Sequence, residues 1–137
     1  MFLTISYVSS ASEKLTIEDI EMLMIDTKVN NNRNNIRGIL VYIDRNFFQI
    51  IEGEYHKTMS LFQRIQRDNR HYNILKILET KSLHRKYKRF NSNYITSCSE
   101  EASNSLLKFL EISNEDIPDL RLHDLIVDQS KALLSMS

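Results

Sequence analysis

The segment Phe-Phe-Gln-Ile-Ile at residues 47–51 constrains the fold of this chain more than any other feature. Aromatic and β-branched residues favour an extended backbone, in which alternate side chains point to opposite faces of a sheet. Phe47, Gln49 and Ile51 therefore face one way, while Phe48 and Ile50 face the other. Because both faces carry large apolar side chains, we expect a strand in a sheet that is covered on both sides.

The rest of the first hundred residues alternates between strand and helix patterns. A two-residue period at residues 2–9 predicts a strand, and so do the apolar runs at 36–43 and 73–79 and a stretch that ends near 95. Helical spacing predicts helices over 16–30 and 56–68, and Thr16 followed by Asp19 resembles a capping box. We expect the Asn-rich stretch at 30–35 to break the first helix, because Asn side chains compete for backbone hydrogen bonds.

This order of elements predicts an α+β fold with a ferredoxin-like core, βαββαβ, plus an extra strand. The two helices can cover one face of the sheet. Leucine-rich helical spacing after Cys98 predicts two C-terminal helices, which we expect to pack on the second face, although a partner chain could supply the same cover. The expected organisation is a domain at residues 1–96 and a helical extension at 97–137 within one globular unit.

Composition excludes several classes of function. Eighteen Lys and Arg balance eighteen Asp and Glu, so we expect no nucleic-acid partner, and the basic residues at 84–89 are better explained as a solvated strand edge. The single cysteine and the scattered histidines show no metal-ligand spacing, and we expect His56, His84 and His123 at the surface. No signal peptide or membrane span is evident, so a cytoplasmic protein is expected.

Tyr7 and Gln49 are polar residues at strand positions where the pattern expects apolar ones. A buried amide or phenol without a partner costs roughly 1–3 kcal/mol, so the two side chains could satisfy each other. Tyr7 alone fits an ordinary core tyrosine whose hydroxyl reaches the rim of the core. For Gln49, the sequence pattern alone is equally compatible with a structural role and with a ligand-binding role.

The residues around these two resemble the BLUF family of blue-light sensors that use a flavin. The resemblance covers residues 2–95, and the Phe-Gln-Ile-Ile-Glu-Gly run at 48–53 is its most diagnostic piece. Its other pieces are Tyr7, the Asn30–Asn31 pair, Ile36 with Gly38, and the stretch from Arg64 to His71.

The resemblance implies a flavin held without a covalent bond between the two core helices, usually FAD, with FMN and riboflavin as alternatives. Leu23 and Ile65 match the aliphatic positions on either side of the flavin ring, and Asn31 matches the asparagine that pairs with the flavin imide. A carboxamide suits that position because it both donates and accepts hydrogen bonds. Asn30 matches a second position that lines the pocket, and Arg64 matches a side chain near the flavin phosphate. Asp68, Arg70 and His71 match residues around the ring edge and the ribityl chain.

The resemblance also implies that Tyr7 and Gln49 perform the photochemistry. In the family, light draws an electron and a proton from the tyrosine to the flavin, and the glutamine amide rearranges its hydrogen bonds by rotation or tautomerism. One departure concerns the last strand, where many relatives carry a tryptophan and a methionine. Phe90 and Ser92 stand at those positions here, which leaves the route of signal output open.

The sequence therefore predicts a blue-light photoreceptor rather than an enzyme. We expect the signal to reach a separate downstream protein or to act through self-association, with a homo-oligomer as the expected state and no membrane partner. A small flavin oxidoreductase is an alternative, but nothing resembles a nicotinamide site or a substrate base. The other alternative is a flavin-free interaction module in which Tyr7 and Gln49 form only a structural pair.

Overall fold

A computed structural model describes residues 1–43, 45–85, 87 and 92–96 of the chain. These residues form the predicted α+β fold, in the order βαββαβ with one further strand. The elements are β1 (Phe2–Ala11), α1 (Ile17–Arg33), β2 (Arg37–Ile43), β3 (Asn46–Glu54), α2 (Tyr55–Arg67), β4 (His71–Ser82) and β5 (Asn93–Thr96).

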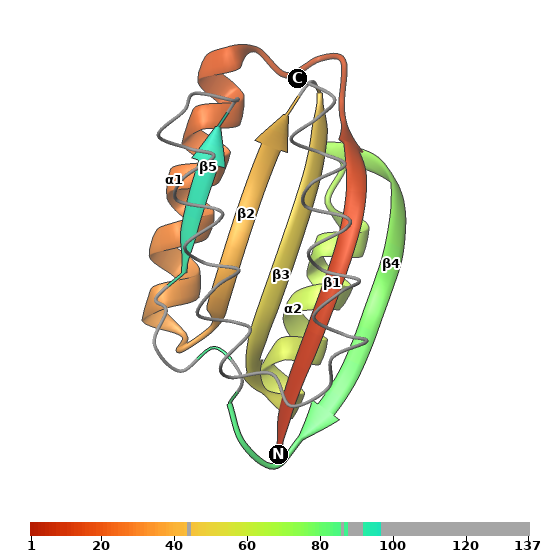
Figure 1. Ribbon diagram of the computed structural model, residues 1–137. Coiled ribbons are helices and arrows are strands. Elements are labelled where there is room, and N and C mark those ends of the chain that lie inside the picture. Colours follow the sequence, from red (N-terminus) through yellow and green to blue (C-terminus); the bar gives the residue numbers. More distant parts are fainter. Residues whose placement is uncertain (44, 86, 88–91, 97–137) are drawn as a thin grey trace.

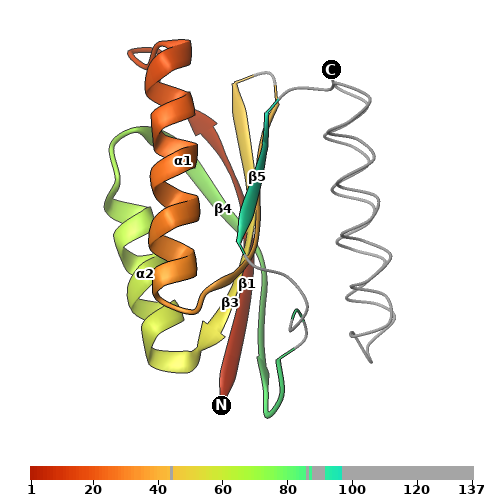
Figure 2. The same ribbon diagram turned by 90° about the vertical axis from the view of Figure 1, so that its left-hand side faces the viewer.

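The strands form one five-stranded sheet in the order β4-β1-β3-β2-β5. The first four are antiparallel neighbours, and β5 extends the sheet by pairing parallel to β2 (Figure 1). Both helices lie on the same face of this sheet, as Figure 2 shows. The prediction that the two core helices cover one face is therefore confirmed. No helix within the described part of the chain is long and apolar enough to cross a membrane.

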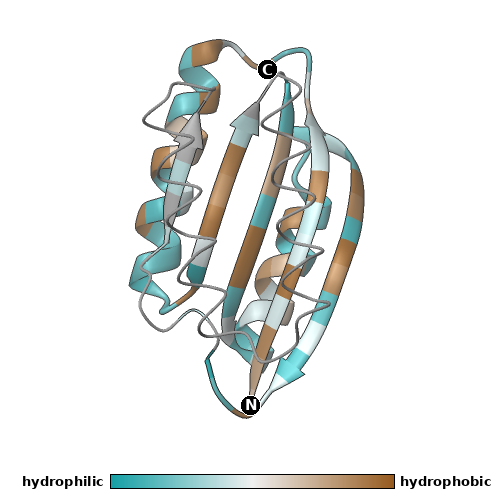
Figure 3. Cartoon of the chain, viewed as in Figure 1, coloured by the Kyte–Doolittle hydropathy of each residue, from teal (hydrophilic) through white to brown (hydrophobic). Residues whose placement is uncertain are grey.

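The β2–β3 hairpin depends on a glycine. Gly38 has a φ of 139°, and a Cβ at this position would lie 1.9 Å from the Ile50 carbonyl oxygen on β3. A side chain there would push the two strands apart, so only glycine lets them pair at this point. In Figure 3, β2 is largely hydrophobic, β3 has hydrophobic stretches interrupted by hydrophilic residues, and the edge strand β4 alternates between the two kinds.

Helix α1 begins as predicted and ends later than predicted. The Thr16 side chain accepts a hydrogen bond from the Asp19 backbone, and Asp19 accepts one from the Thr16 backbone, which completes the capping box. The Asn-rich stretch at 30–35 does end the helix, as predicted, but the helix continues to Arg33 rather than ending near residue 30. The Asn34 backbone N–H closes the helix, and Asn35 follows with a φ of 59°, a conformation that asparagine tolerates well.

The core on the helix side of the sheet joins β1 and β3 to α2. Leu3, Ile5 and Tyr7 of β1 pack with Ile51 of β3 and Phe62 of α2. On the opposite face, Phe48 and Ile50 are also buried, as the two-sided pattern of this strand predicts. The two C-terminal helices predicted after residue 97 lie outside the described residues, and so does Phe90.

Candidate functional site

A cavity of about 660 Å³ lies among the sheet and the two helices. This volume is within the usual range for a small-molecule site. All ten residues that the sequence singled out as switch or cofactor-binding residues line it: Tyr7, Leu23, Asn30, Asn31, Gln49, Arg64, Ile65, Asp68, Arg70 and His71.

Tyr7 and Gln49 form a hydrogen-bonded pair at the sheet wall of the cavity. They lie directly opposite each other in the β1–β3 register, and the Tyr7 hydroxyl donates to Gln49 Oε1 at 2.5 Å. Both side chains are buried. Burial raises the pKa of the Tyr7 hydroxyl well above its ordinary value, and the charge of Asp68 raises it further. Tyr7 is therefore a neutral donor at physiological pH.

Two buried carboxamides in this cavity have unused hydrogen-bonding capacity. Among the described residues, the Gln49 side chain makes only the bond with Tyr7, so its Nε2 donors remain available. The Asn31 side chain lines the same cavity, is 4% exposed, and makes no hydrogen bond to any described residue. Because unpaired buried amides are costly, this arrangement suits a ligand that both donates and accepts hydrogen bonds.

His71 is fixed by the protein on both sides of its ring. Nε2 lies 2.6 Å from the Ile65 carbonyl oxygen, and Nδ1 lies 2.8 Å from Ser9 Oγ. Since a carbonyl only accepts, Nε2 carries a proton and donates it to Ile65, while Nδ1 shares its hydrogen bond with the Ser9 hydroxyl. The His71 ring also meets Tyr7 and Phe47 edge-on, with ring centroids 6.1 and 6.3 Å apart. The His71 ring is therefore held in a fixed orientation and forms a rigid part of the cavity wall.

Charged side chains gather on the α2 side of the cavity and just beyond the end of that helix. Arg70 donates through Nη2 to Asp68 Oδ2 at 2.6 Å, and this contact lowers the pKa of Asp68 below its ordinary value. Arg64 is exposed on α2 and forms no ion pair with any described residue. Lys57 lies on the same helix and also lines the cavity. An anionic group could therefore be held here.

Apolar walls come from both helices, with Leu23 on α1 and Ile65 on α2, each partly buried. Sequence reasoning missed nine lining residues. Helical spacing from Leu23 and Arg64 points to Thr27, Lys57, Ser60 and Leu61, and the strand pattern points to Leu40 and Phe47. The full set of missed residues is Thr27, Asn34, Ile36, Leu40, Phe47, His56, Lys57, Ser60 and Leu61. His56 is exposed, as predicted.

A contact next to Asn31 joins α1 to the segment that leads into β5. The Asn32 side chain donates through Nδ2 to the Ser92 carbonyl oxygen at 3.1 Å, and its Oδ1 accepts from the Ser92 backbone N–H at 2.7 Å. These paired bonds hold the Ser92 backbone as a neighbouring strand would. The Ser92 backbone is thus tied to α1 directly beside the cavity-lining residue Asn31.

The fold and site define a domain of the ferredoxin-like class, with a buried phenol–amide pair beside a cavity of a size suited to a small molecule. The chain belongs to the BLUF family, the sensors of blue-light using FAD, whose family model matches residues 2–93. It therefore carries a blue-light photoreceptor domain, of a kind that binds flavin.

The comparisons with individual proteins agree with this assignment. The chain is 30% identical over 78 residues to the blue light- and temperature-regulated antirepressor BluF of Escherichia coli, a match that covers 57% of this chain and 19% of that protein. The chain thus spans less than a fifth of that curated relative.

Two of the similar solved structures illustrate the match. The BlsA photo-activated state is 26% identical, with a TM-score of 0.67 and coverage of 98% of this chain and 95% of that one. Klebsiella pneumoniae BlrP1 with FMN and cyclic diGMP is 26% identical, with a TM-score of 0.67 and coverage of 80% and 30%.

Proposed function

We propose that this chain binds FAD in the cavity between its two helices and responds to blue light through the Tyr7–Gln49 pair. The observation that carries the proposal is the 2.5 Å hydrogen bond between these side chains at the wall of a cavity whose lining residues all lie within the stretch that the family model matches. If Gln49 had only a structural role, its Nε2 donors would be left facing a cavity with no hydrogen-bond partner.

The residues present fit a flavin ring. Such a ring is flat and apolar on its two faces and polar along one edge, where an imide donates and accepts. Leu23 and Ile65 supply aliphatic surface from the two helices, and Asn31 supplies a buried carboxamide for the imide edge. Asn30 lines the same wall from α1. His71 would shape the ring edge of the site by packing, because both of its ring nitrogens are already bonded.

The charged side chains at the helix α2 end fit the phosphates of a nucleotide flavin. Arg64 has no ionic partner among the described residues, whereas the charges of Asp68 and Arg70 compensate each other. We therefore assign phosphate binding to Arg64, and the ordering of the adjoining turn to the Asp68–Arg70 pair. FMN would satisfy the same contact, and riboflavin would not.

The switch itself is a proton and hydrogen-bond exchange within the pair. The bound flavin supplies the absorption of blue light and the capacity to accept an electron. Tyr7 supplies that electron, and its Oη proton moves along the existing bond toward Gln49 Oε1. Because a carboxamide has a donor end and an acceptor end, the Gln49 side chain can invert its hydrogen bonds by rotation or tautomerism without leaving its place. The electron and the proton then return to Tyr7, so the only lasting change is the inverted arrangement of the Gln49 amide, which is the signalling state.

The output is proposed to leave the site toward a separate protein. Gln49 faces Leu40 across the β2–β3 register, and Leu40 in turn pairs with Tyr94 on β5. The Asn32–Ser92 contact joins the same strand to the cavity wall of α1. A change at Gln49 therefore has one short connection to β5, through Leu40, and the Asn32–Ser92 contact adds a link to that segment from α1; neither uses a methionine.

An absorbance spectrum of the purified chain tests the proposal. We expect bound flavin and, under blue light, a small reversible red shift without bleaching. A colourless protein that takes up no added flavin would contradict the proposal and favour an interaction module. Bleaching that persists until an oxidant is added would favour an oxidoreductase.

A further inference from the structure

Helix α1 carries an exposed apolar stripe on the side away from the cavity. Four of the eight large hydrophobic side chains exposed in the described part of the chain lie on this helix. Three of them, Met22, Ile25 and Val29, follow one another at three- and four-residue spacing, which places them on one face. Their exposed fractions are 57%, 38% and 47%. A stripe of this pattern is typical of a helix that packs against another helix.

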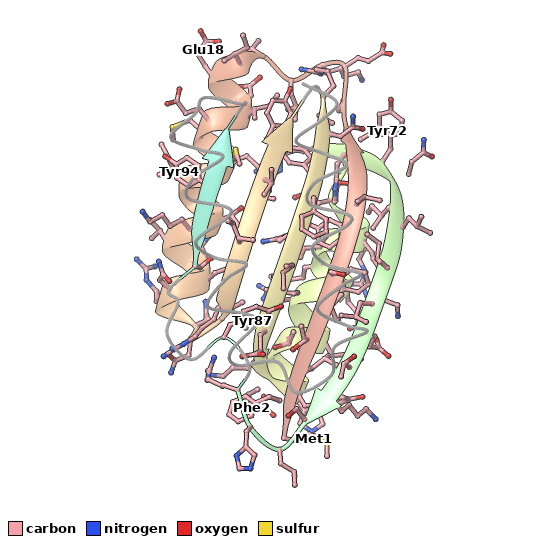
Figure 4. All side chains as sticks on the ribbon, viewed as in Figure 1. Met1, Phe2, Glu18, Tyr72, Tyr87 and Tyr94 are labelled. Carbon is pink, nitrogen blue, oxygen red and sulfur yellow. The ribbon has the colours of Figure 1, made fainter. Side chains whose placement is uncertain are left out.

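Opposite charges stand at the two ends of this stripe. Glu18 lies one turn before Met22, and Arg33 lies one turn after Val29, so both extend the same face. Both side chains are exposed, and neither has an ionic partner among the described residues. Figure 4 shows Glu18 on the outside of the molecule at the N-terminal end of α1. The two charges are separated by about 22 Å along the helix.

We propose that this face binds the same face of a second copy, with the two α1 helices antiparallel across a two-fold axis. The axis would pass midway between Ile25 and Asp26. In this register Glu18 lies opposite the partner's Arg33, and Met22 lies opposite the partner's Val29. The symmetry makes each contact twice, as in any isologous interface.

The order of charges favours a second copy in this orientation over the parallel one. A parallel pair would place Glu18 beside the partner's Glu18, and like charges in contact are destabilising. The antiparallel pair brings acid to base at both ends and places Met22, Ile25 and Val29 between them, with Asp26 beside these apolar residues at the axis. One helix pair buries little surface, so we expect a dimer that forms reversibly with concentration.

This interface is compatible with the site. The cavity is lined by Leu23, Thr27 and Asn31, which lie on the other side of the same helix. The dimer therefore leaves the cavity open, and its existence does not depend on flavin binding. The inference goes beyond the photoreceptor function, and each can fail without the other.

Sedimentation velocity of the full chain over a range of concentrations tests the inference, with circular dichroism to verify folding. A single exposed ion pair contributes little to the free energy of dimerisation. In a two-fold dimer, however, reversing one charge changes both symmetry-related copies of the pair. We expect Glu18→Arg and Arg33→Glu each to raise the dimerisation Kd about tenfold or more. The double variant with both changes should return the Kd to within about threefold of wild type.

Two further variants serve as controls. Met22→Asp should abolish the dimer, whereas Leu75→Asp, which changes an equally exposed apolar residue on β4, should leave it intact. A wild-type chain that stays monomeric would overturn the proposal and leave the face to another protein. A dimer that persists in both single charge variants, or that the double variant fails to restore, would also overturn it.

Discussion

The inner wall and the mouth of the cavity use polar groups in opposite ways. At the wall, Tyr7, Gln49 and Asn31 are buried and uncharged, and two of them keep unused hydrogen-bonding capacity. At the mouth, Arg64 and Lys57 are charged and exposed. A buried neutral group responds strongly to a small change in its partners, because no water replaces a lost bond. An exposed charge is screened and contributes less. The buried wall is therefore suited to switching hydrogen bonds, and the exposed mouth is suited to holding a charged part of a ligand.

The largest expected effect comes from removing the phenol at the wall. Tyr7→Phe deletes the hydroxyl that donates to Gln49 and leaves the ring packing with Phe62 and His71 in place. We expect flavin to stay bound and the reversible red shift to disappear completely, as measured by light-minus-dark absorbance. Tyr42→Phe, at a partly buried tyrosine on β2, is the matched control and should respond normally. A normal shift in Tyr7→Phe would show that the phenol is not needed.

Removing the second carboxamide should weaken binding rather than switching. Asn31→Ala leaves the imide edge of a flavin without its partner, a loss of about 1–3 kcal/mol, or roughly fivefold to more than a hundredfold in Kd. Fluorescence titration with FMN measures this effect, and Asn69→Ala, at an exposed asparagine beyond α2, should leave the Kd unchanged. Equal affinity in the two variants would remove Asn31 from the site.

A smaller effect is expected at the mouth. Arg64→Ala should weaken FMN and FAD binding by only a few fold, and the loss should shrink as salt is added. Riboflavin, which has no phosphate, should bind wild type and variant equally. Arg67→Ala changes an exposed arginine of the same helix that does not line the cavity, and it should have no effect. If riboflavin binding falls as much as FMN binding, Arg64 does not hold the phosphate.

The smallest expected effect is that of pH on the light response. Because burial and Asp68 raise the pKa of Tyr7 in the folded state, the phenol keeps its proton throughout the neutral and mildly alkaline range. We expect a constant red shift from about pH 6 to pH 9, below the ordinary tyrosine pKa of about 10. Loss of the shift with a midpoint inside that range would contradict the assigned protonation state.

The same raised pKa has a consequence for stability. Above about pH 10 the unfolded chain releases the Tyr7 proton while the folded chain retains it, so the free energy of unfolding must fall as pH rises. Below that pH, Tyr7 is protonated in both states and does not contribute to the pH dependence of the free energy of unfolding. Denaturant unfolding of wild type and Tyr7→Phe at alkaline pH should show this part of the decline only in the wild type.

Much of the wall could be predicted from the sequence, and the reason is periodicity. Gln49 stands out because it interrupts an apolar strand, and the strand register places it opposite Tyr7. The end of α1 could not be predicted this way. The Asn-rich stretch does end the helix, yet burial of Asn31 and the tie between Asn32 and Ser92 keep its first residues helical. That tie joins residues far apart in the sequence, which local patterns do not report.

The mouth was harder to predict than the wall for a related reason. Arg64 follows from the family resemblance, but Lys57 and Ser60 line the cavity only because α2 is oriented with that side toward α1. Charged residues on an exposed helix face carry little periodic signal, since most of them are simply solvated. Their position therefore depended on tertiary packing that the sequence pattern does not report.

The light-minus-dark spectrum of Gln49→Leu tests the central claim most directly, with Gln63→Leu, at an exposed glutamine of α2, as its control. Leucine fills a similar volume without a donor or acceptor, so we expect Gln49→Leu to give a yellow protein that shows no red shift under blue light, while the control shifts normally. A normal, reversible red shift in Gln49→Leu would contradict the assignment of this amide as the switch.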